Sequence, residues 1–311
     1  MSEPARTRKP DISAGLDQVE KFATILLPRD AEEPILAPGP RYAIYEWLTE
    51  IRARPDLESV GLKPRSTALL YGPPGTGKTT LAHHLAARLG LPLVTVQADR
   101  MTSKYMNESA NNIGQLFDAI DKIKNGCVLF LDEFDSLGSK RSSSEHGTDK
   151  DRNLTLTTLL TRVEGFEGIL LAATNRKEDL DTAMWRRFGM QISVDLPGSE
   201  ERYAILKRYS LPFEFPDDAL DTLADLTAGA SPALLRQMME GLKRSIVLAP
   251  RLKKPIDDVV EVFRGLVATT VPHPDVPQPH LWKKFDACAA DLRTIPWPPE
   301  RAPAEKKGGA K

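Results

Sequence analysis

The octapeptide GPPGTGKT, residues 72–79, restricts the fold of this chain more than any other part of the sequence. It follows the apolar run TALLY and precedes the helical run KTTLAHHLAARL, so it links a buried strand to a helix. The spacing G-x-x-x-x-G-K-[ST] in this context is typical of a loop whose backbone amides surround phosphate oxygens. A glycine-rich turn without function is the alternative, and the strand and helix on either side argue against it.

The loop predicts how a nucleoside triphosphate is bound. Lys78 is expected to reach the β- and γ-phosphates, and Thr79 is expected to offer its hydroxyl to Mg²⁺. The N-terminus of the following helix adds partial positive charge. ATP and Mg²⁺ are therefore the expected cofactors. The loop residues expected to bind the nucleotide are Gly72, Pro73, Pro74, Gly75, Thr76, Gly77, Lys78, Thr79 and Thr80.

Apolar runs alternate with helical stretches from residue 67 to about residue 197. The runs are TALLY, PLVTV, CVLFL, ILLAAT and QISVD. They lack strict polar alternation, as expected for strands that are buried on both faces. The pattern predicts an α/β fold with a parallel five-stranded P-loop NTPase sheet sandwiched by helices.

The rest of the chain is divided by composition. Residues 13–27 carry apolar side chains at helical spacing and are predicted to form a helix, and only helices are expected between residues 198 and 270. Trp282 and Trp297, in the Pro-rich segment that follows, either anchor a partner or dock on their own chain. The predicted segments are 1–40 (N-terminal extension and linker), 41–197 (α/β), 198–270 (helical) and 271–311 (Pro-rich tail).

A second motif, VLFLDEFD at residues 128–135, is an apolar strand that ends in acids. Ligands of parallel sheets bind beyond the carboxyl ends of the strands, so the side chain of Asp132 is expected to hold Mg²⁺, directly or through water. Glu133 is the expected general base that orients and activates the attacking water. A plain solvated strand end is the alternative, and the phosphate loop in the same chain argues against it.

Together these motifs resemble the AAA+ ATPases, and among them the spastin and katanin type. The likeness extends over about residues 60–250 and includes GPPGTGKT, LDEFDSL and ILLAATNRKEDLDTAMWRRF. It implies that residues 198–270 form the small helical lid subdomain of that family. It further implies a compact single-ring member, of the kind found in bacteria.

The resemblance also implies functional residues. Asn175 matches the polar residue that senses the γ-phosphate, and Arg186 and Arg187 match the arginines that act on the nucleotide of a neighbouring subunit. The usual family sequence has Pro-Gly between these two arginines, and this chain lacks that dipeptide, so the arginine that contacts phosphate stays open. In the lid, Ile205 matches a position that packs on adenine. Arg236 is either the lid arginine that reaches the nucleotide in many AAA+ relatives or an ordinary arginine on a helix surface, because the run that starts at Ser231 departs from the sequence usual in the spastin and katanin type.

The work that hydrolysis drives is suggested by the segment TSKYMNES, residues 102–109. It resembles the family's pore loop, in which an aromatic side chain grips an unfolded polypeptide; Lys104, Tyr105 and Met106 are the matching residues. The resemblance implies a ring of identical subunits, a hexamer, that acts on a protein client. A protease partner is left open. The alternatives are a loader or regulator that acts on nucleic acid and a nucleotide-controlled partner-binding switch.

Composition narrows these alternatives. The net charge is −1, and neither a basic domain nor a zinc-ligand spacing is present, so nucleic acid is the less expected partner. No apolar run reaches the ~18 residues needed to span a bilayer, so no membrane association is expected. The two cysteines are far apart, which together with the missing signal-like apolar segment favours a cytoplasmic location.

Overall fold

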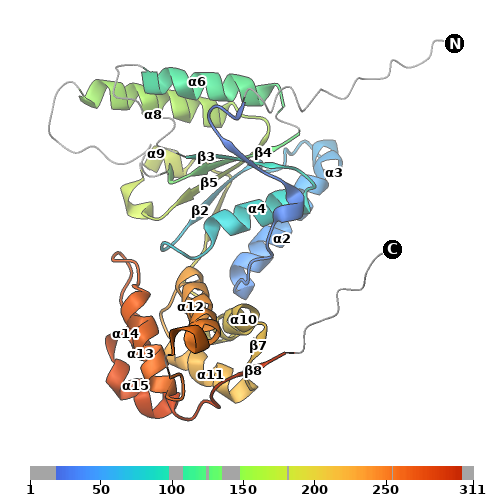
Figure 1. Ribbon diagram of the computed structural model, residues 1–311. Helices are drawn as coiled ribbons and strands as arrows, with labels where there is room; N and C mark the ends of the chain where they lie inside the picture. The colour runs from blue at the N-terminus through green and yellow to red at the C-terminus, as the bar shows by residue number, and fades with distance from the viewer. Residues whose placement is uncertain are drawn as a thin grey trace. The chain divides into compact units, whose positions relative to one another are not determined.

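The computed structural model describes residues 19–97, 108–123, 126–134, 148–180, 182–253 and 255–302 (Figure 1). The chain forms two compact units. The first contains Gly39–Gly72 and Lys78–Val194 together with the segment that ends at Pro34. The second contains Ile35–Pro38, Pro73–Gly77 and the chain from Asp195 onward.

The first unit is built on a six-stranded sheet with the order β1-β3-β4-β5-β2-β6. All neighbours pair in parallel except β1 and β3. The predicted fold class, a mixed α/β domain with a mostly parallel sheet, is confirmed. The strands are β1 (Thr24–Leu26), β2 (Thr67–Tyr71), β3 (Leu93–Gln97), β4 (Val128–Asp132), β5 (Ile169–Thr174) and β6 (Met190–Ser193).

Strand β1 corrects the sequence analysis, which assigned residues 13–27 to a helix and counted five strands. Thr24–Leu26 instead pairs antiparallel with Leu93–Thr95 at the edge of the sheet. Val19 and Ala23, two apolar residues of the predicted helix, are buried in the core. The helix prediction is wrong for Thr24–Leu26, where pairing with the open edge of β3 outweighs a weak local helical preference. Val19 is helical, and residues 13–18 of the predicted helix lie outside the described residues.

Helices cover both faces of this sheet. Figure 1 shows α6 and α8 on one face and α2 and α4 on the other. Adjacent residues such as Leu69 and Leu70 point to opposite faces and are both fully buried, which explains the uninterrupted apolar runs. The helices of this unit are α2 (Pro38–Arg52), α3 (Arg54–Ser59), α4 (Lys78–Arg88), α6 (Glu108–Asp121), α8 (Thr148–Glu164) and α9 (Thr182–Trp185), with short 3-10 turns at Pro28–Asp30 and Lys177–Asp179.

The second unit is mainly helical. Its helices are α10 (Ser199–Ser210), α11 (Asp217–Leu226), α12 (Pro232–Leu252), α13 (Val259–Thr269), α14 (His280–Lys283) and α15 (Phe285–Leu292). The prediction that only helices lie between residues 198 and 270 is wrong, because β7 (Phe213–Glu214) is a strand that pairs antiparallel with β8 (Glu300–Arg301). Helix α12 begins as its sequence indicated: the Ser231 hydroxyl accepts a hydrogen bond from the Leu234 amide at 3.3 Å.

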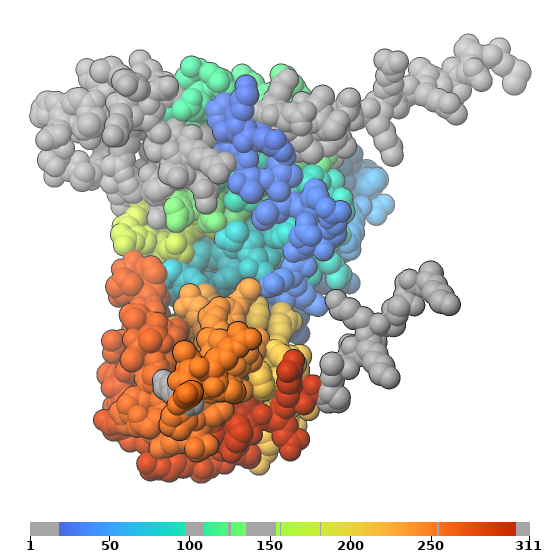
Figure 2. Space-filling view, viewed as in Figure 1, coloured from blue at the N-terminus to red at the C-terminus, as the bar shows by residue number. Residues whose placement is uncertain are grey.

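Residues of the Pro-rich segment complete the core of the second unit. Leu281, Cys288 and Leu292 are at most 1% exposed and belong to the same apolar cluster as α10–α13. The indole N–H of Trp282 donates to the Thr270 carbonyl at 2.6 Å, and that of Trp297 donates to the Ile256 carbonyl. Both tryptophans thus dock on their own chain. In Figure 2 the red C-terminal strand lies beside the yellow segment that contains β7.

We predict that Leu292→Ala destabilises the second unit by about 2–5 kcal/mol, because its side chain is fully buried and its removal leaves a cavity. Leu252→Ala is the matched control, since that leucine is 67% exposed, and its effect should stay within about 0.5 kcal/mol. Hydrogen exchange of the α12 amides measures the difference. Equal protection in the two variants would mean that the segment after residue 270 contributes nothing to the core of the second unit.

Candidate active site

Three of the predicted functional segments leave the sheet at the same edge. Strand β5 lies between β4 and β2, with Leu131 opposite Ala172 and Tyr71 opposite Thr174. Because these strands are parallel, the phosphate loop after Tyr71, the acids at the end of β4 and Asn175 after β5 all follow carboxyl ends. This is the edge at which parallel sheets bind ligands, at the point where the strand order reverses.

The two predicted Mg²⁺ ligands are in contact. The Thr79 hydroxyl, on the first turn of α4, donates to Asp132 Oδ2 at 2.9 Å. The other oxygen, Oδ1, accepts the backbone amide of Glu133 at 3.0 Å. Both carboxylate oxygens are thereby oriented, and the hydroxyl and the carboxylate are brought together from residues that are 53 positions apart.

Lys78 lies against the start of the phosphate loop. Its side chain is 7% exposed, and Nζ donates to the Gly72 carbonyl at 2.9 Å. The Gly72 amide donates to the Thr174 carbonyl at 3.4 Å, and Asn175 is the next residue in the chain. The hydrogen bond between Gly72 and Thr174 therefore places Asn175 beside the start of the loop. The side chain of Asn175 is exposed.

Residues Pro73–Gly77 of the loop group with the second unit. There the Ala233 amide, at the start of α12, donates to the Gly75 carbonyl at 3.1 Å. Gly75 has a φ of +76°, and a Cβ at this position would lie 2.9 Å from the Ser231 hydroxyl. Glycine is required at this position both by backbone conformation and by the close approach of α12. No local pattern in the sequence indicates this contact.

Glu133 adopts an unusual backbone conformation. Its φ is 51°, in the left-handed region that residues with a Cβ rarely occupy. Such conformations cost of order 1 kcal/mol and occur preferentially at active sites, where the surroundings enforce them. The next residue, Phe134, is buried and its ring packs edge-to-face on Phe188 with the centroids 5.4 Å apart. The predicted base is thus held at a fixed turn at the end of β4.

The structure separates the two arginines that the sequence could not distinguish. Arg186 is exposed, and its side chain has no partner among the described residues. Arg187 donates through Nη1 to the Ala183 carbonyl at 2.8 Å, and its Nε lies 3.4 Å from Glu164 Oε2. Glu164 is 66% exposed, so this ion pair contributes little stability, but the two contacts together hold Arg187 against its own unit.

The two predicted lid residues lie in the second unit. Ile205 is 2% exposed inside the apolar cluster, against which Ile35 also packs. The Nε of Arg236 donates to Glu240 at 2.9 Å, and its guanidinium lies 5.2 Å from the centre of the Tyr209 ring. The hydrogen bond from Arg236 lowers the pKa of the Glu240 carboxyl. The contacts of Ile205 with adenine and of Arg236 with nucleotide stay predictions.

The predicted pore-loop residues Lys104, Tyr105 and Met106 lie outside the described residues.

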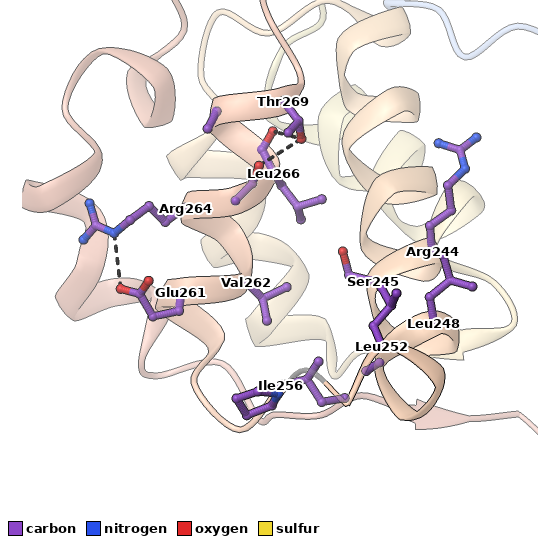
Figure 3. A pocket seen from close by; sticks show the side chains of 14 residues that line it. Arg244, Ser245, Leu248, Leu252, Ile256, Glu261, Val262, Arg264, Leu266 and Thr269 are labelled. Carbon is purple, nitrogen blue, oxygen red and sulfur yellow. Dashed lines mark hydrogen bonds and ion pairs between the residues drawn. The ribbon is translucent and has the colours of Figure 1, made fainter.

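A cavity of about 520 Å³ opens between the last turns of α12 and helix α13 in the second unit. Figure 3 shows that its wall is largely apolar, with Val262 and Leu266 facing Leu248 and Leu252. None of the residues predicted to bind nucleotide lines it. In the described part of the chain, no helix is long and apolar enough to cross a membrane.

Comparison with known proteins identifies the family. Residues 68–196 match the family model described as ATPase family associated with various cellular activities (AAA). The proteasome-activating nucleotidase of Pyrococcus abyssi is 31% identical over 296 residues, which cover 85% of this chain and 74% of that protein. The chain belongs to the AAA family of ATPases. ATP with Mg²⁺ is therefore its cofactor, and ATP hydrolysis is its reaction.

Two further relatives share a smaller part of their length with this AAA chain. The proteasome-activating nucleotidase of Methanopyrus kandleri is 33% identical, over 72% of this chain and 57% of that protein. The ATP-dependent zinc metalloprotease FTSH 2, chloroplastic, of Arabidopsis thaliana is 35% identical, over 68% of this chain and 32% of that protein. The chain thus spans less than two thirds of either relative.

A solved structure shares the fold. The crystal structure of the FIGL-1 AAA domain in complex with ADP covers 93% of this chain and 99% of its own, with a TM-score of 0.65 and 23% identity. Its likeness concerns the arrangement of strands and helices that places the phosphate loop beside the acids of β4.

The residues present suit Mg·ATP. Lys78 would hold the β- and γ-phosphates, and Thr79 and Asp132 would hold Mg²⁺; a hydroxyl and a carboxylate already 2.9 Å apart form a suitable pair of oxygen ligands. The bound Mg²⁺ would neutralise the charge that develops on the phosphates. Glu133, whose carboxylate follows the strand end directly, would orient water and accept its proton.

We predict that Gly72→Ala impairs both folding and nucleotide binding in this AAA chain. The residue has a φ of +150°, and a Cβ would lie 2.2 Å from the Val194 carbonyl oxygen. We expect a loss of at least about 2 kcal/mol of stability and a nucleotide affinity lowered about tenfold or more. Thermal unfolding and titration with a fluorescent ADP analogue measure these two effects.

Gly39→Ala is the control for this substitution, because nothing lies within 4 Å of the added methyl group and its φ is ordinary. It should leave both quantities unchanged. If Gly72→Ala and Gly39→Ala had the same stability and the same nucleotide affinity, the packing of the loop against Val194 would be irrelevant to the site.

Proposed function

We propose that this chain is the ATP-hydrolysing subunit of a ring that unfolds or disassembles protein clients. The observation that carries the proposal is the exposed side chain of Arg186, which has no partner among the described residues, on a turn where the adjacent Arg187 is held in place. An arginine presented in this way suits the nucleotide of an adjacent subunit, where it would neutralise transition-state charge. Such head-to-tail contacts close into rings, and we propose a hexamer.

The names of the relatives support a protein client. Proteasome-activating nucleotidases and an ATP-dependent zinc metalloprotease are all named for work beside, or joined to, proteolysis. We therefore propose that this chain also acts on polypeptide, through the segment containing Lys104, Tyr105 and Met106, and that a separate protease receives the client. An aromatic side chain offers large contact area with little loss of rotamer freedom, which suits gripping without sequence preference.

The finer placement in the spastin and katanin type is also a proposal. It is supported by the sequence ILLAATNRKEDLDTAMWRRF, in which Arg186 and Arg187 are adjacent without the intervening Pro-Gly. The net charge of −1 gives no general attraction to nucleic acid. Binding to DNA that weakens steeply with salt would favour a nucleic-acid loader over a protein motor. Nucleotide-dependent partner binding without turnover would favour a switch.

The shared active site predicts a complementation experiment. Glu133→Gln removes the base of a subunit's own site, and Arg186→Ala removes the arginine it gives to its neighbour. Each variant alone should lose ATPase activity, the second by about 10³-fold or more. Mixed rings should regain measurable turnover, because an Arg186→Ala subunit keeps its base and receives an arginine from a Glu133→Gln neighbour.

Arg187→Ala is the matched control for the choice between the arginines. Because Arg187 is engaged by Ala183 and Glu164, its loss should cost less activity than the loss of Arg186. Steady-state phosphate release, with ring assembly followed by light scattering, is the measurement. Mixed rings that assemble and stay inactive would contradict the shared site.

The client is sought with Glu133→Gln, which should bind ATP, assemble and retain its substrate because hydrolysis is blocked. Proteins that co-purify with this variant but not with Lys78→Ala, which should not bind ATP, are the candidates. Unfolding of such a protein by the unaltered chain with ATP tests the motor activity. A client that binds but is never unfolded would favour the switch.

A further inference from the structure

The turn that carries the two arginines is held by one side chain from the following strand. It runs from the end of α9 at Trp185 to the start of β6 at Met190. The side-chain amide nitrogen of Gln191 donates to the Trp185 carbonyl at 3.1 Å and to the Phe188 carbonyl at 2.7 Å. These carbonyls belong to the residues immediately before Arg186 and immediately after Arg187.

We propose that Gln191 is a positioning residue for ATP hydrolysis in the neighbouring subunit: its amide fixes the turn so that Arg186 is presented outward in one orientation. This inference rests on the function proposed above and adds a residue to it. A glutamine amide has two N–H donors, and both are used here. Because both partners are carbonyl oxygens, only the nitrogen end of the amide can face them.

A second side chain holds the same turn from the sheet. The Thr67 hydroxyl accepts the Gly189 amide at 3.0 Å and lies 3.4 Å from the Arg187 carbonyl, to which it can donate. Thr67 is buried in β2, so its replacement would disturb the core. Gln191, by contrast, is on the exposed face of the edge strand β6. Its amide is therefore the contact that can be removed without altering the packing of the unit.

An exposed arginine can act with the precision that catalysis needs only if the turn that carries it is fixed. The Phe188 ring is anchored in the core against Phe134, and the Arg186 and Arg187 amides donate to the Thr182 and Met184 carbonyls at 3.2 and 3.1 Å. Those contacts fix the two ends of the turn but leave the Trp185 and Phe188 carbonyls to Gln191. Misplacement of a charged group by 1 Å can cost about 100-fold in rate.

The test compares Gln191→Met, which keeps the length of the side chain and removes both donors, with Gln191→Lys, which keeps a donor. Gln115→Met makes the same chemical change at an exposed position of α6 and is the control. We expect Gln191→Met to lower kcat about 100-fold with the affinity for a fluorescent ADP analogue unchanged. Gln191→Lys should recover most of the rate, and Gln115→Met should match the unaltered chain.

Mixed rings separate positioning from simple destabilisation. A Gln191→Met subunit keeps its own phosphate loop and base, so mixing with Glu133→Gln subunits, which present a normal arginine, should restore turnover. Mixing with Arg186→Ala subunits should restore none, because neither variant delivers an effective arginine. If Arg186→Ala is rescued by Glu133→Gln but Gln191→Met is not, Gln191 serves its own site or its own fold, and the inference is wrong.

Two other outcomes are equally decisive. Full activity of Gln191→Met alone would show that the turn needs no amide clamp and would overturn the inference. Failure of Glu133→Gln to rescue Arg186→Ala would instead refute the shared site itself, and the proposed function would fall before the role of Gln191 is reached.

Discussion

The parallel arrangement of β2, β5 and β4 determines the active site, and the hydrogen bond between the Thr79 hydroxyl and Asp132 is its most direct consequence. The two groups lie 2.9 Å apart although one starts α4 and the other ends β4. They meet because β2 and β4 run parallel on either side of β5, so that their carboxyl ends are level. An antiparallel β4 would place the acids at the opposite edge of the sheet, and the phosphate loop would have no metal ligand beside it.

The same sheet also links the base to the arginine turn. Glu133 occupies a left-handed conformation at the end of β4, and the adjacent Phe134 packs on Phe188 in the core. Phe188 directly follows Arg187, and its carbonyl accepts from Gln191. Within one subunit, the Phe134–Phe188 contact therefore links the group that would activate water in its own site to the turn that would serve the next site.

Most strands and motifs of the first unit were predictable from local sequence. The strands that the sequence did not predict were missed for one common reason. The phosphate loop, the acids of β4 and the five parallel strands are contiguous patterns whose periodicity and flanking residues identify them. Strands β1 and β7–β8 are two or three residues long and exist only because a distant segment pairs with them, at Leu93–Thr95 and at Glu300–Arg301. No local pattern encodes such a partner.

The arginines show the same limit within the site. Arg186 and Arg187 are chemically identical and adjacent, so the sequence could not separate them; the partner that does so, Glu164, ends a helix 23 positions earlier than Arg187. Gln191 is one polar residue on an edge strand, and nothing in its neighbours signals its two carbonyl contacts. Asn175 could be assigned to the end of a strand because it directly follows a buried apolar run of the parallel sheet, and its role at the γ-phosphate stays a prediction.

In the proposed ring, one chain binds the triphosphate and the adjoining chain supplies the guanidinium that completes hydrolysis. The most direct measurement is the ATPase rate per chain as a function of chain concentration at saturating Mg·ATP, with the molar mass recorded in the same samples. We expect almost no turnover in dilute monomer and a steep rise that coincides with ring formation. A constant rate per chain, maintained where every particle has the mass of one subunit, would contradict it.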